Sequence, residues 1–281
     1  MSNQPQLQPP SILLMGPSGS GKTYSLSTLL EAGLEVFIVS TEPRGIETLL
    51  DTVAAKKLDL SKLHWRYIGP SRPGFQTLAE QGELVSRSNQ DALSKQIPKI
   101  RENPSWVEML KTFVDFRDDK DGKSYGDVTK FDGTRALVID SLSGISAMAM
   151  DVVVGDKVTA NVGEWGIAIK ALDKFILTCC SDLKCFFVMT AHIEREEDPL
   201  TGATKTMTST LGKKLAPSIP RYFSEVLSAE TDSDGEKRSF RWSNNTNGFV
   251  LKNRSLPVSS KLEPNFGPIV QAYKKRLASI S

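Results

Sequence analysis

The sequence predicts an α/β fold with a mostly parallel β-sheet, and three patterns carry that prediction. Short apolar runs alternate with segments of helical periodicity from residue 11 to residue 69, which is the rhythm of a parallel sheet. The rhythm resumes with "RALVID" (135–140), "EWGIAIKALDKFIL" (164–177) and "CFFVMTA" (185–191). Beyond Ala216, alternating segments separated by "DSDGE" and "NTNG" predict antiparallel strands near the C-terminus.

Each expected element has a local reason. Strands are predicted where apolar, β-branched-rich runs are short and end in turn residues: 11–16, 34–41, 62–69, 135–140 and 185–191. A helix is predicted over 22–33, because Leu26 and Leu30 have helical spacing and Gly33 suits a C-terminal cap. Helical patterns also cover 45–58 and 164–177. The late antiparallel strands are expected within 221–230, 237–244 and 248–255.

One domain, spanning residues 11–256, accounts for this pattern. The polar, Pro-containing residues 1–10 are expected to be a disordered lead-in. The signal is weaker over 72–132, which we interpret as a variable insertion of helices and loops. Residues 257–281 are expected to be a basic tail, because the stretch from Lys252 onward holds six basic residues against one acid.

Composition excludes several classes of protein. Hydrophobic residues make up 39% and charged residues 24%, which is ordinary for a globular chain, and the net charge of +2 does not indicate a nucleic-acid binder. Three cysteines without a CxxC pair predict neither a disulfide framework nor a zinc ribbon. With no secretory signal pattern and no apolar run near the roughly 20 residues of a membrane helix, we expect a cytoplasmic protein that does not bind membranes.

The segment "GPSGSGKT" (16–23) matches the phosphate-binding pattern G-x-x-x-x-G-K-[ST] in full. It lies between a predicted strand and a predicted helix, where backbone N–H groups and the helix N-terminus face an anion. Lys22 is expected to reach the β- and γ-phosphates of ATP, and the Thr23 hydroxyl is expected to bind Mg²⁺. The expected nucleotide-binding residues are Gly16, Pro17, Ser18, Gly19, Ser20, Gly21, Lys22, Thr23 and Tyr24.

Three further polar residues end or follow predicted strands. Asp140 ends "RALVID" and is expected to hold Mg²⁺, the alternative being a turn or helix-capping aspartate. Glu42, in "FIVSTEPRG", is expected to orient the attacking water unless it is a solvent-facing turn residue. His192 ends "CFFVMTAH"; such a histidine is either structural or a donor toward a γ-phosphate oxygen. In a parallel sheet these strand ends share one edge.

These motifs together resemble the RecA-like P-loop ATPases, and more closely the compact phage nucleotide-binding proteins of the Sak-type single-strand annealing and recombination group. The resemblance runs from about Ile12 to Leu256. Its motifs are "GPSGSGKT", "FIVSTEPRG", "LVIDSLSG", "FFVMTAHIERE", "LGKKLAPSIPRYFSEVL" and "LKNRS". It implies a RecA-like P-loop NTPase core that binds ATP and Mg²⁺.

The resemblance also implies roles for single residues. Glu42 matches the acid that activates water, Asp140 the Walker B aspartate, and His192 a γ-phosphate sensor that is usually Gln in the recombinases. Lys252 and Arg254 of "LKNRS" match basic residues that enter a neighbour's ATP site. The DNA-facing loops would be about 151–163 and 194–214, and their candidate basic residues are Lys157, Arg195, Lys205, Lys213 and Lys214.

The implied function is ATP hydrolysis in phage-type DNA recombination or single-strand annealing, slow without assembly or DNA. The implied partners are single-stranded DNA, other copies of the chain in a ring or filament, and a single-strand binding or annealing protein. A nucleotide-switched assembly or loading factor that acts through protein partners is the alternative. The near-neutral charge favours this alternative. The second loop also holds four acids that balance the charge of its basic residues. These acids are Glu194, Glu196, Glu197 and Asp198.

Overall fold

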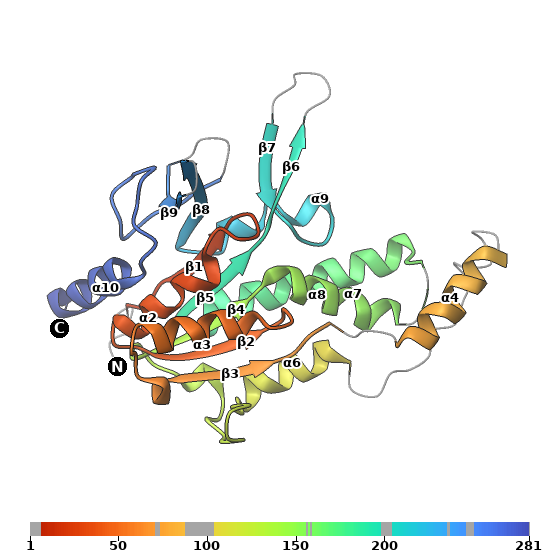
Figure 1. Cartoon of the computed structure of the whole chain (residues 1–281), viewed down its shortest axis with the longest axis horizontal. Coiled ribbons are helices and arrows are strands. Elements are labelled where there is room, and N and C mark those ends of the chain that lie inside the picture. Colours follow the sequence, from red (N-terminus) through yellow and green to blue (C-terminus); the bar gives the residue numbers. More distant parts are fainter. Residues whose placement is uncertain are drawn as a thin grey trace, which may run out of the picture.

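A seven-stranded sheet organises the chain, in the order β3-β2-β4-β5-β1-β8-β9 (Figure 1). The computed structural model describes residues 7–70, 74–87, 104–155, 157, 159–197, 204–234, 237–245 and 250–280. The strands of the sheet are β1 (Ser11–Met15), β2 (Glu35–Ser40), β3 (Leu63–Tyr67), β4 (Arg135–Asp140), β5 (Phe186–Ala191), β8 (Glu225–Asp234) and β9 (Lys237–Ser243). Neighbouring strands are parallel except β8 and β9, which are antiparallel. The predicted α/β class, with antiparallel pairing added near the C-terminus, is confirmed.

Helices cover both faces of the sheet, and the side chains of β1 show why. Leu13 and Met15 enter one core cluster, whereas Ile12 and Leu14 enter the other, because successive residues of a strand point to opposite faces. The first cluster receives residues of α6 (Ser105–Val114), α7 (Leu142–Val154) and α8 (Val162–Asp182). The second receives residues of α2 (Ser27–Glu31), α3 (Gly45–Ala55) and α10 (Gly267–Ile280). The sheet is thus buried on both sides.

Shorter elements complete the described residues. The helix predicted over 22–33 is divided into α1 (Lys22–Ser25) and α2, with Leu26 between them in a right-handed helical conformation. The hairpin of β6 (Ile193–Glu197) and β7 (Thr204–Thr208) extends away from the sheet (Figure 1). The remaining elements are α4 (Phe75–Arg87), α9 (Gly212–Leu215) and 3₁₀ turns at Leu60–Lys62, Val128–Lys130 and Ile219–Arg221.

The predicted insertion, 72–132, contributes to the core. Trp106 and Met109 of α6 are buried in the first cluster, and so are Phe116 and Phe131 from the segment that follows. Phe131 packs 4.5 Å from the ring of Phe37 on β2, measured between centroids. The second half of the insertion is therefore a structural part of the domain. Its polar, turn-rich sequence gave little sign of these buried residues.

Residues 257–281, predicted to be a basic tail outside the domain, pack against it, so the predicted boundary at residue 256 is wrong. Leu262 pairs with Trp242 of β9, and α10 buries Ile269, Val270 and Tyr273 against the second cluster. These apolar residues have the i, i+4 spacing of a helix face, but the basic residues around them made the segment resemble a solvated tail in the sequence. The domain therefore continues through α10.

Residues 7–10, the end of the predicted disordered lead-in, are ordered, so this prediction is also wrong for them. The carbonyl of Pro10 accepts a hydrogen bond from the Phe187 amide at 3.3 Å, and Leu7 packs against the second cluster. Residues 7–10 are thus fixed beside β5, and residues 1–6 lie outside the described residues.

The segment "LKNRS" does not form a third long antiparallel strand. Lys252 makes an isolated antiparallel bridge to Val226 of β8, beyond the point where β9 ends. The bridge fixes Lys252 and Arg254 near the start of β8. Among the helices of the described residues, none is long and apolar enough to cross a membrane.

We predict that Ile269→Ala destabilises the fold by about 2–5 kcal/mol, because it removes a fully buried side chain from the cluster beneath α10. Chemical denaturation of the variant measures the change. Lys275→Ala, at an exposed position on the same helix, is the matched control and should stay within about 0.5 kcal/mol of wild type. Equal stability of both variants would contradict the packing of α10 as part of the domain.

Candidate nucleotide site

The phosphate loop and three of the predicted site residues, Glu42, Asp140 and His192, meet at the carboxyl edge of the parallel sheet. The loop 16–21 follows β1, Glu42 follows β2, Asp140 ends β4 and His192 follows β5. The strands β2, β4, β5 and β1 are consecutive neighbours in the sheet, so these chain segments reach the edge side by side. Ligands of open parallel sheets bind at this edge.

The loop between β1 and α1 has the backbone of a phosphate cradle. Gly19 and Gly21 have φ angles of 74° and 79°, in the left-handed region that favours glycine. A Cβ at Gly16 would lie 2.5 Å from the carbonyl oxygen of Ala229, so this position also requires glycine. The Ser20 hydroxyl donates to the Pro17 carbonyl at 2.8 Å and closes the turn. Ser18 is exposed at its tip.

Lys22 lies inside this cradle. Its Nζ donates to the carbonyl of Gly16 at 2.9 Å and to that of Pro17 at 2.8 Å, and the residue is buried. Burial lowers the pKa of Lys22, and the carboxylates of Asp140 and Glu42 act in the opposite direction. The ammonium is therefore held among carbonyl oxygens at the place where the motif requires a cation.

The carboxylate of Asp140, at the end of β4, joins that strand to α1 and to β5. Oδ2 accepts a hydrogen bond from the Thr23 hydroxyl at 2.8 Å, and Oδ1 accepts one from the Thr190 hydroxyl of β5. Burial raises the pKa of Asp140, while the two hydroxyl donors favour the ionised form. The peptide bond that follows Asp140 is cis. Thr190 was not among the predicted site residues; its signal is a single hydroxyl in the apolar run "CFFVMTA".

The donor set fits Mg²⁺ bound together with phosphate. Among the described residues there is no cluster of three or more His, Cys, Asp or Glu side chains that could hold a metal ion. A hydroxyl and a carboxylate 2.8 Å apart suit Mg²⁺, which usually binds one or two protein oxygens together with phosphate oxygens and water. Thr23 and Asp140 would hold the ion, and it would neutralise charge on the phosphates.

Glu42 accepts two hydrogen bonds at one oxygen. Its Oε1 lies 2.9 Å from Nε2 of His192 and 2.7 Å from the Ser141 hydroxyl. The hydrogen bond from His192 is the largest influence on this carboxyl, and with that from Ser141 it lowers the pKa of Glu42 to about 2. Glu42 therefore stays ionised at neutral pH. Any stability from these contacts is present above its ordinary pKa of 4.5 and is lost as the pH falls toward 2.

The backbone around Glu42 is fixed by Thr41 and Ser141. The Ser141 amide donates to the Thr41 hydroxyl at 2.8 Å, and that hydroxyl donates to the Ser141 carbonyl at 3.1 Å. Both residues are buried. Ser141 was not among the predicted site residues, because Glu42, the side chain to which its hydroxyl donates, is distant in the chain.

His192 connects the site to the β6–β7 hairpin. Its ring contacts Glu42, and its carbonyl accepts a hydrogen bond from the Ser209 amide at 2.8 Å, just after β7 ends. Ser209 also donates from its hydroxyl to Glu194 at 2.6 Å. A displacement of His192 would therefore be transmitted to the base of the hairpin.

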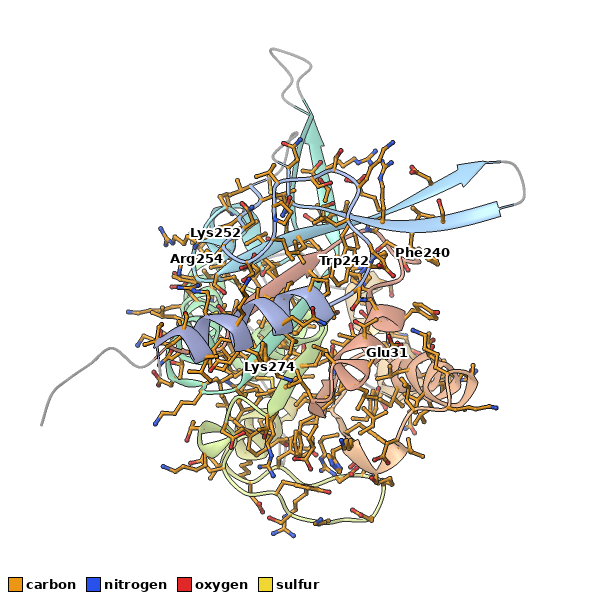
Figure 2. All side chains as sticks on the ribbon, turned by 90° about the vertical axis from the view of Figure 1, so that its left-hand side faces the viewer. Glu31, Phe240, Trp242, Lys252, Arg254 and Lys274 are labelled. Carbon is orange, nitrogen blue, oxygen red and sulfur yellow. The ribbon has the colours of Figure 1, made fainter. Side chains whose placement is uncertain are left out.

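Lys252 and Arg254 lie far from the phosphate loop of their own chain. They are placed beside Val226 and Glu225, at the amino end of β8, whereas the loop follows the carboxyl end of β1, which runs parallel to β8. Figure 2 shows both residues across the molecule from Phe240, which contacts the loop. The structure thus does not bring these two residues together with the rest of the predicted site.

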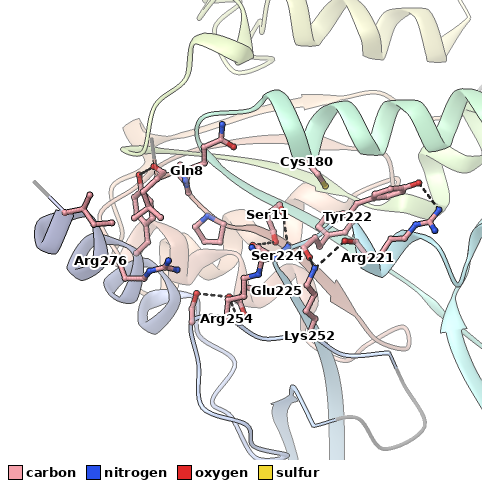
Figure 3. Close-up of a pocket in the computed structure, with 17 residues that line it drawn as sticks. Gln8, Ser11, Cys180, Arg221, Tyr222, Ser224, Glu225, Lys252, Arg254 and Arg276 are labelled. Carbon is pink, nitrogen blue, oxygen red and sulfur yellow. Dashed lines mark hydrogen bonds between the residues drawn. The ribbon is translucent and has the colours of Figure 1, made fainter. Parts of the chain in front are cut away.

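A cavity of about 590 Å³ surrounds these two residues (Figure 3). Lys252 Nζ donates to the carbonyl of Phe223 at 2.7 Å, and burial lowers the pKa of Lys252. Arg254 is exposed, and its amide contacts the buried carboxylate of Glu225. Arg221 and Arg276 also line the cavity, so its charge is mostly positive.

The predicted DNA-facing residues have different surroundings. Lys157 forms an ion pair with Glu164, and both side chains are only 13% exposed, which argues against Lys157 as a DNA contact. Both ends of the loop predicted at 151–163 are helical, since α7 ends at Val154 and α8 begins at Val162. Arg195 is exposed on β6. The side chains of Lys205, Lys213 and Lys214 lie outside the described residues.

Tyr24 and Phe240 flank the phosphate loop. Tyr24, one of the predicted nucleotide-binding residues, is 43% exposed, with Nζ of Lys56 4.8 Å from its ring centroid. Phe240 of β9 contacts Gly21 and was not predicted, because a position in a late strand carries no sign of proximity to residue 21.

Comparisons with known proteins give similarities of fold only. No family model and no curated protein matches the chain. Among solved structures, a KaiC-like protein from Pyrococcus horikoshii is similar with a TM-score of 0.37 and 12% identity, over 84% of this chain and 78% of that chain. The flagellar accessory protein FlaH from Methanocaldococcus jannaschii is similar with a TM-score of 0.39 and 14% identity, over 92% of this chain and 88% of that chain. Neither similarity transfers a function to this chain.

We predict that His192→Ala raises the pKa of Glu42 from about 2 toward 4.5, because it removes the largest of the contacts that stabilise the carboxylate. Titration of the Glu42 carboxyl carbon by NMR measures the pKa. Ser141→Ala should raise it by a smaller amount, since the Ser141 hydrogen bond is the weaker contact. An unchanged Glu42 pKa in His192→Ala would show that the imidazole does not hold this carboxylate in solution.

Proposed function

We propose that this chain is a RecA-like, Mg²⁺-dependent ATPase whose site is completed by assembly. The convergence of Lys22, Thr23, Asp140 and Glu42 at one sheet edge is the observation that carries the proposal. Lys22 would contact the β- and γ-phosphates, and the loop amides would bind the phosphate oxygens. Asp140 and Thr23 would hold Mg²⁺ between those oxygens.

Glu42 would orient the attacking water rather than remove its proton first. A carboxylate with a pKa of about 2 is a weak base, but it accepts a hydrogen bond well. The water oxygen attacks the γ-phosphorus, the bond to the bridging oxygen breaks, and ADP leaves. The water proton passes to a phosphate oxygen or through Glu42. His192 would set the basicity of Glu42, and a γ-phosphate that drew the imidazole away would strengthen the base.

Lys252 and Arg254 would act in the site of a neighbouring copy. Among the described residues, the hydrogen-bond partners found for Glu42, Asp140 and His192 include no arginine, and Arg254 is exposed at the opposite sheet edge. A guanidinium beside the γ-phosphate stabilises charge in the transition state and accelerates hydrolysis on the order of 10³–10⁵-fold. Supplied in trans, it would make hydrolysis depend on a ring or filament.

We predict that Arg254→Ala lowers hydrolysis per site by a factor on the order of 10³–10⁵ and leaves ATP affinity unchanged. Lys22→Ala should prevent ATP binding in its own site while keeping Arg254 intact. Mixing the two inactive variants should therefore restore phosphate release, because a Lys22→Ala protomer supplies Arg254 to an Arg254→Ala neighbour.

Arg117→Ala, an exposed arginine in the insertion, is the control and should hydrolyse ATP at the wild-type rate. If the mixture stays as inactive as its components, Arg254 does not act in trans. Full activity of Arg254→Ala alone would exclude any catalytic role for it.

We further propose that the work coupled to ATP is DNA recombination or single-strand annealing, with the β6–β7 hairpin as the DNA-facing element and an annealing or single-strand binding protein as a partner. The exposed Arg195 and the connection of the hairpin to His192 support this proposal. A loading factor that acts through protein partners is the second candidate, favoured by the ion pair of Lys157 and by the net charge of +2.

We predict that single-stranded DNA stimulates ATP hydrolysis and that the logarithm of the apparent DNA affinity falls linearly with the logarithm of salt concentration. Arg195→Ala should reduce the salt slope by about 1 if the guanidinium contacts one phosphate, while Lys275→Ala should not change it. Phosphate release measured over a range of salt and DNA concentrations tests this. Hydrolysis that is independent of DNA at every salt concentration would support the loading-factor candidate instead.

A further inference from the structure

Phe240 lies against the phosphate loop although it belongs to the last strand of the sheet. A Cβ added to Gly21 would meet three atoms of the Phe240 ring at 3.1–3.4 Å, so the ring packs on the loop backbone directly before Lys22. The Phe240 side chain is nevertheless 37% exposed. One part of the ring thus supports the loop, and another part is open to a ligand.

The neighbours of Phe240 hold it in this place. Trp242, two residues along β9 and on the same face, is fully buried and packs 4.7 Å from Phe266, measured between ring centroids. Arg241 points to the other face, where its guanidinium pairs with Glu230 and Asp232 on β8. Both anchors fix the backbone of β9, so the ring of Phe240 is presented by a rigid element.

A groove of about 450 Å³ adjoins the ring. The segment 261–264 forms its other wall and is fixed to β9 by two hydrogen bonds between Leu262 and Trp242, each 2.8 Å long. Leu262 and Pro264 add apolar surface beside Phe240, and Lys261 and Glu263 add a cation and a carboxylate. Asp232 and Arg241 line the groove as well, so it combines one apolar surface with charged groups. A heteroaromatic ring suits such a groove, because its face can stack on Phe240 while polar atoms at its edge meet the charged groups.

Tyr24 is a second exposed aromatic residue beside the loop, and its surroundings are less suitable for stacking on a base. Nζ of Lys56 lies 4.8 Å from its ring centroid, and the same ammonium donates to Glu31 at 2.7 Å. One region over the Tyr24 ring is therefore occupied by a fixed cation. In the described part of the chain, none of the cations found over an aromatic ring lies over Phe240.

We propose that Phe240 is the stacking platform for the purine base of the bound nucleotide, with the groove toward residues 261–264 receiving the edge of the base. The proposal rests on the proposed ATP site, since the phosphate loop fixes where the nucleotide begins. It gives β9 a role in selecting a nucleoside triphosphate over other polyphosphates. The sequence alone offers no sign of this role, because Gly21 and Phe240 are distant in the chain and no local pattern indicates their contact.

The test compares ATP with inorganic tripolyphosphate, which carries the phosphates without the base. Calorimetry with Mg²⁺ measures the affinity of both ligands for wild type, Phe240→Ala and Phe240→Tyr. Phe240→Ala should weaken ATP binding by about 5- to 150-fold, the range expected for loss of one base–aromatic stack, and change tripolyphosphate binding less than about 2-fold. Phe240→Tyr should retain the ATP affinity of wild type, because it keeps the ring.

Two results would overturn the proposal. Unchanged ATP affinity in Phe240→Ala would exclude the platform, and equal loss of both ligands would mean that Phe240 only supports the loop. Binding of tripolyphosphate by Phe240→Ala also shows that the variant is folded. If wild type binds neither ligand, the proposed ATP site itself fails, and this outcome is distinct from the other two. Phe75→Ala, at a 92% exposed position on α4, is the matched control and should bind both ligands as wild type does.

Discussion

The buried carboxylate of Asp140 is the constraint on which the rest of the site depends. It lies at the end of β4 and accepts hydrogen bonds from Thr23, after β1, and from Thr190, on β5. A carboxylate that is only 5% exposed is costly unless such donors surround it, so the three segments must meet in one arrangement. That arrangement fixes the phosphate loop relative to the strand end that carries Ser141, and Ser141 in turn holds Glu42.

Much of this architecture follows from the sequence, because its signals are local. The motif at 16–23 and the apolar run before Asp140 each predict the end of a strand, and a parallel sheet brings such ends together at one edge. The contacts that tune the site are not local. The bond between His192 and Glu42 joins residues 150 positions apart, and Phe240 reaches Gly21 from the last strand. A polar or basic composition also led to missed core positions, as in α10, where the buried Ile269 and Tyr273 lie among basic residues.

The two edges of the sheet, at opposite ends of the parallel strands, carry different parts of the proposed function. The carboxyl edge holds the groups that we propose to bind phosphate and water, and His192 links that edge to the β6–β7 hairpin through the Ser209 amide. The amino edge carries the basic cavity that contains Lys252 and Arg254. If one copy presents its amino edge to the carboxyl edge of the next, a single contact between protomers would join hydrolysis to assembly, and the hairpin would report the nucleotide state.

An experimental structure of the chain with Mg²⁺ and a non-hydrolysable ATP analogue tests the central claim most directly. We expect the triphosphate in the loop from Gly16 to Thr23, Mg²⁺ on the Thr23 hydroxyl beside Asp140, and Glu42 facing the γ-phosphate. A structure in which the analogue binds elsewhere, or in which the γ-phosphate lies away from both Glu42 and His192, would contradict it.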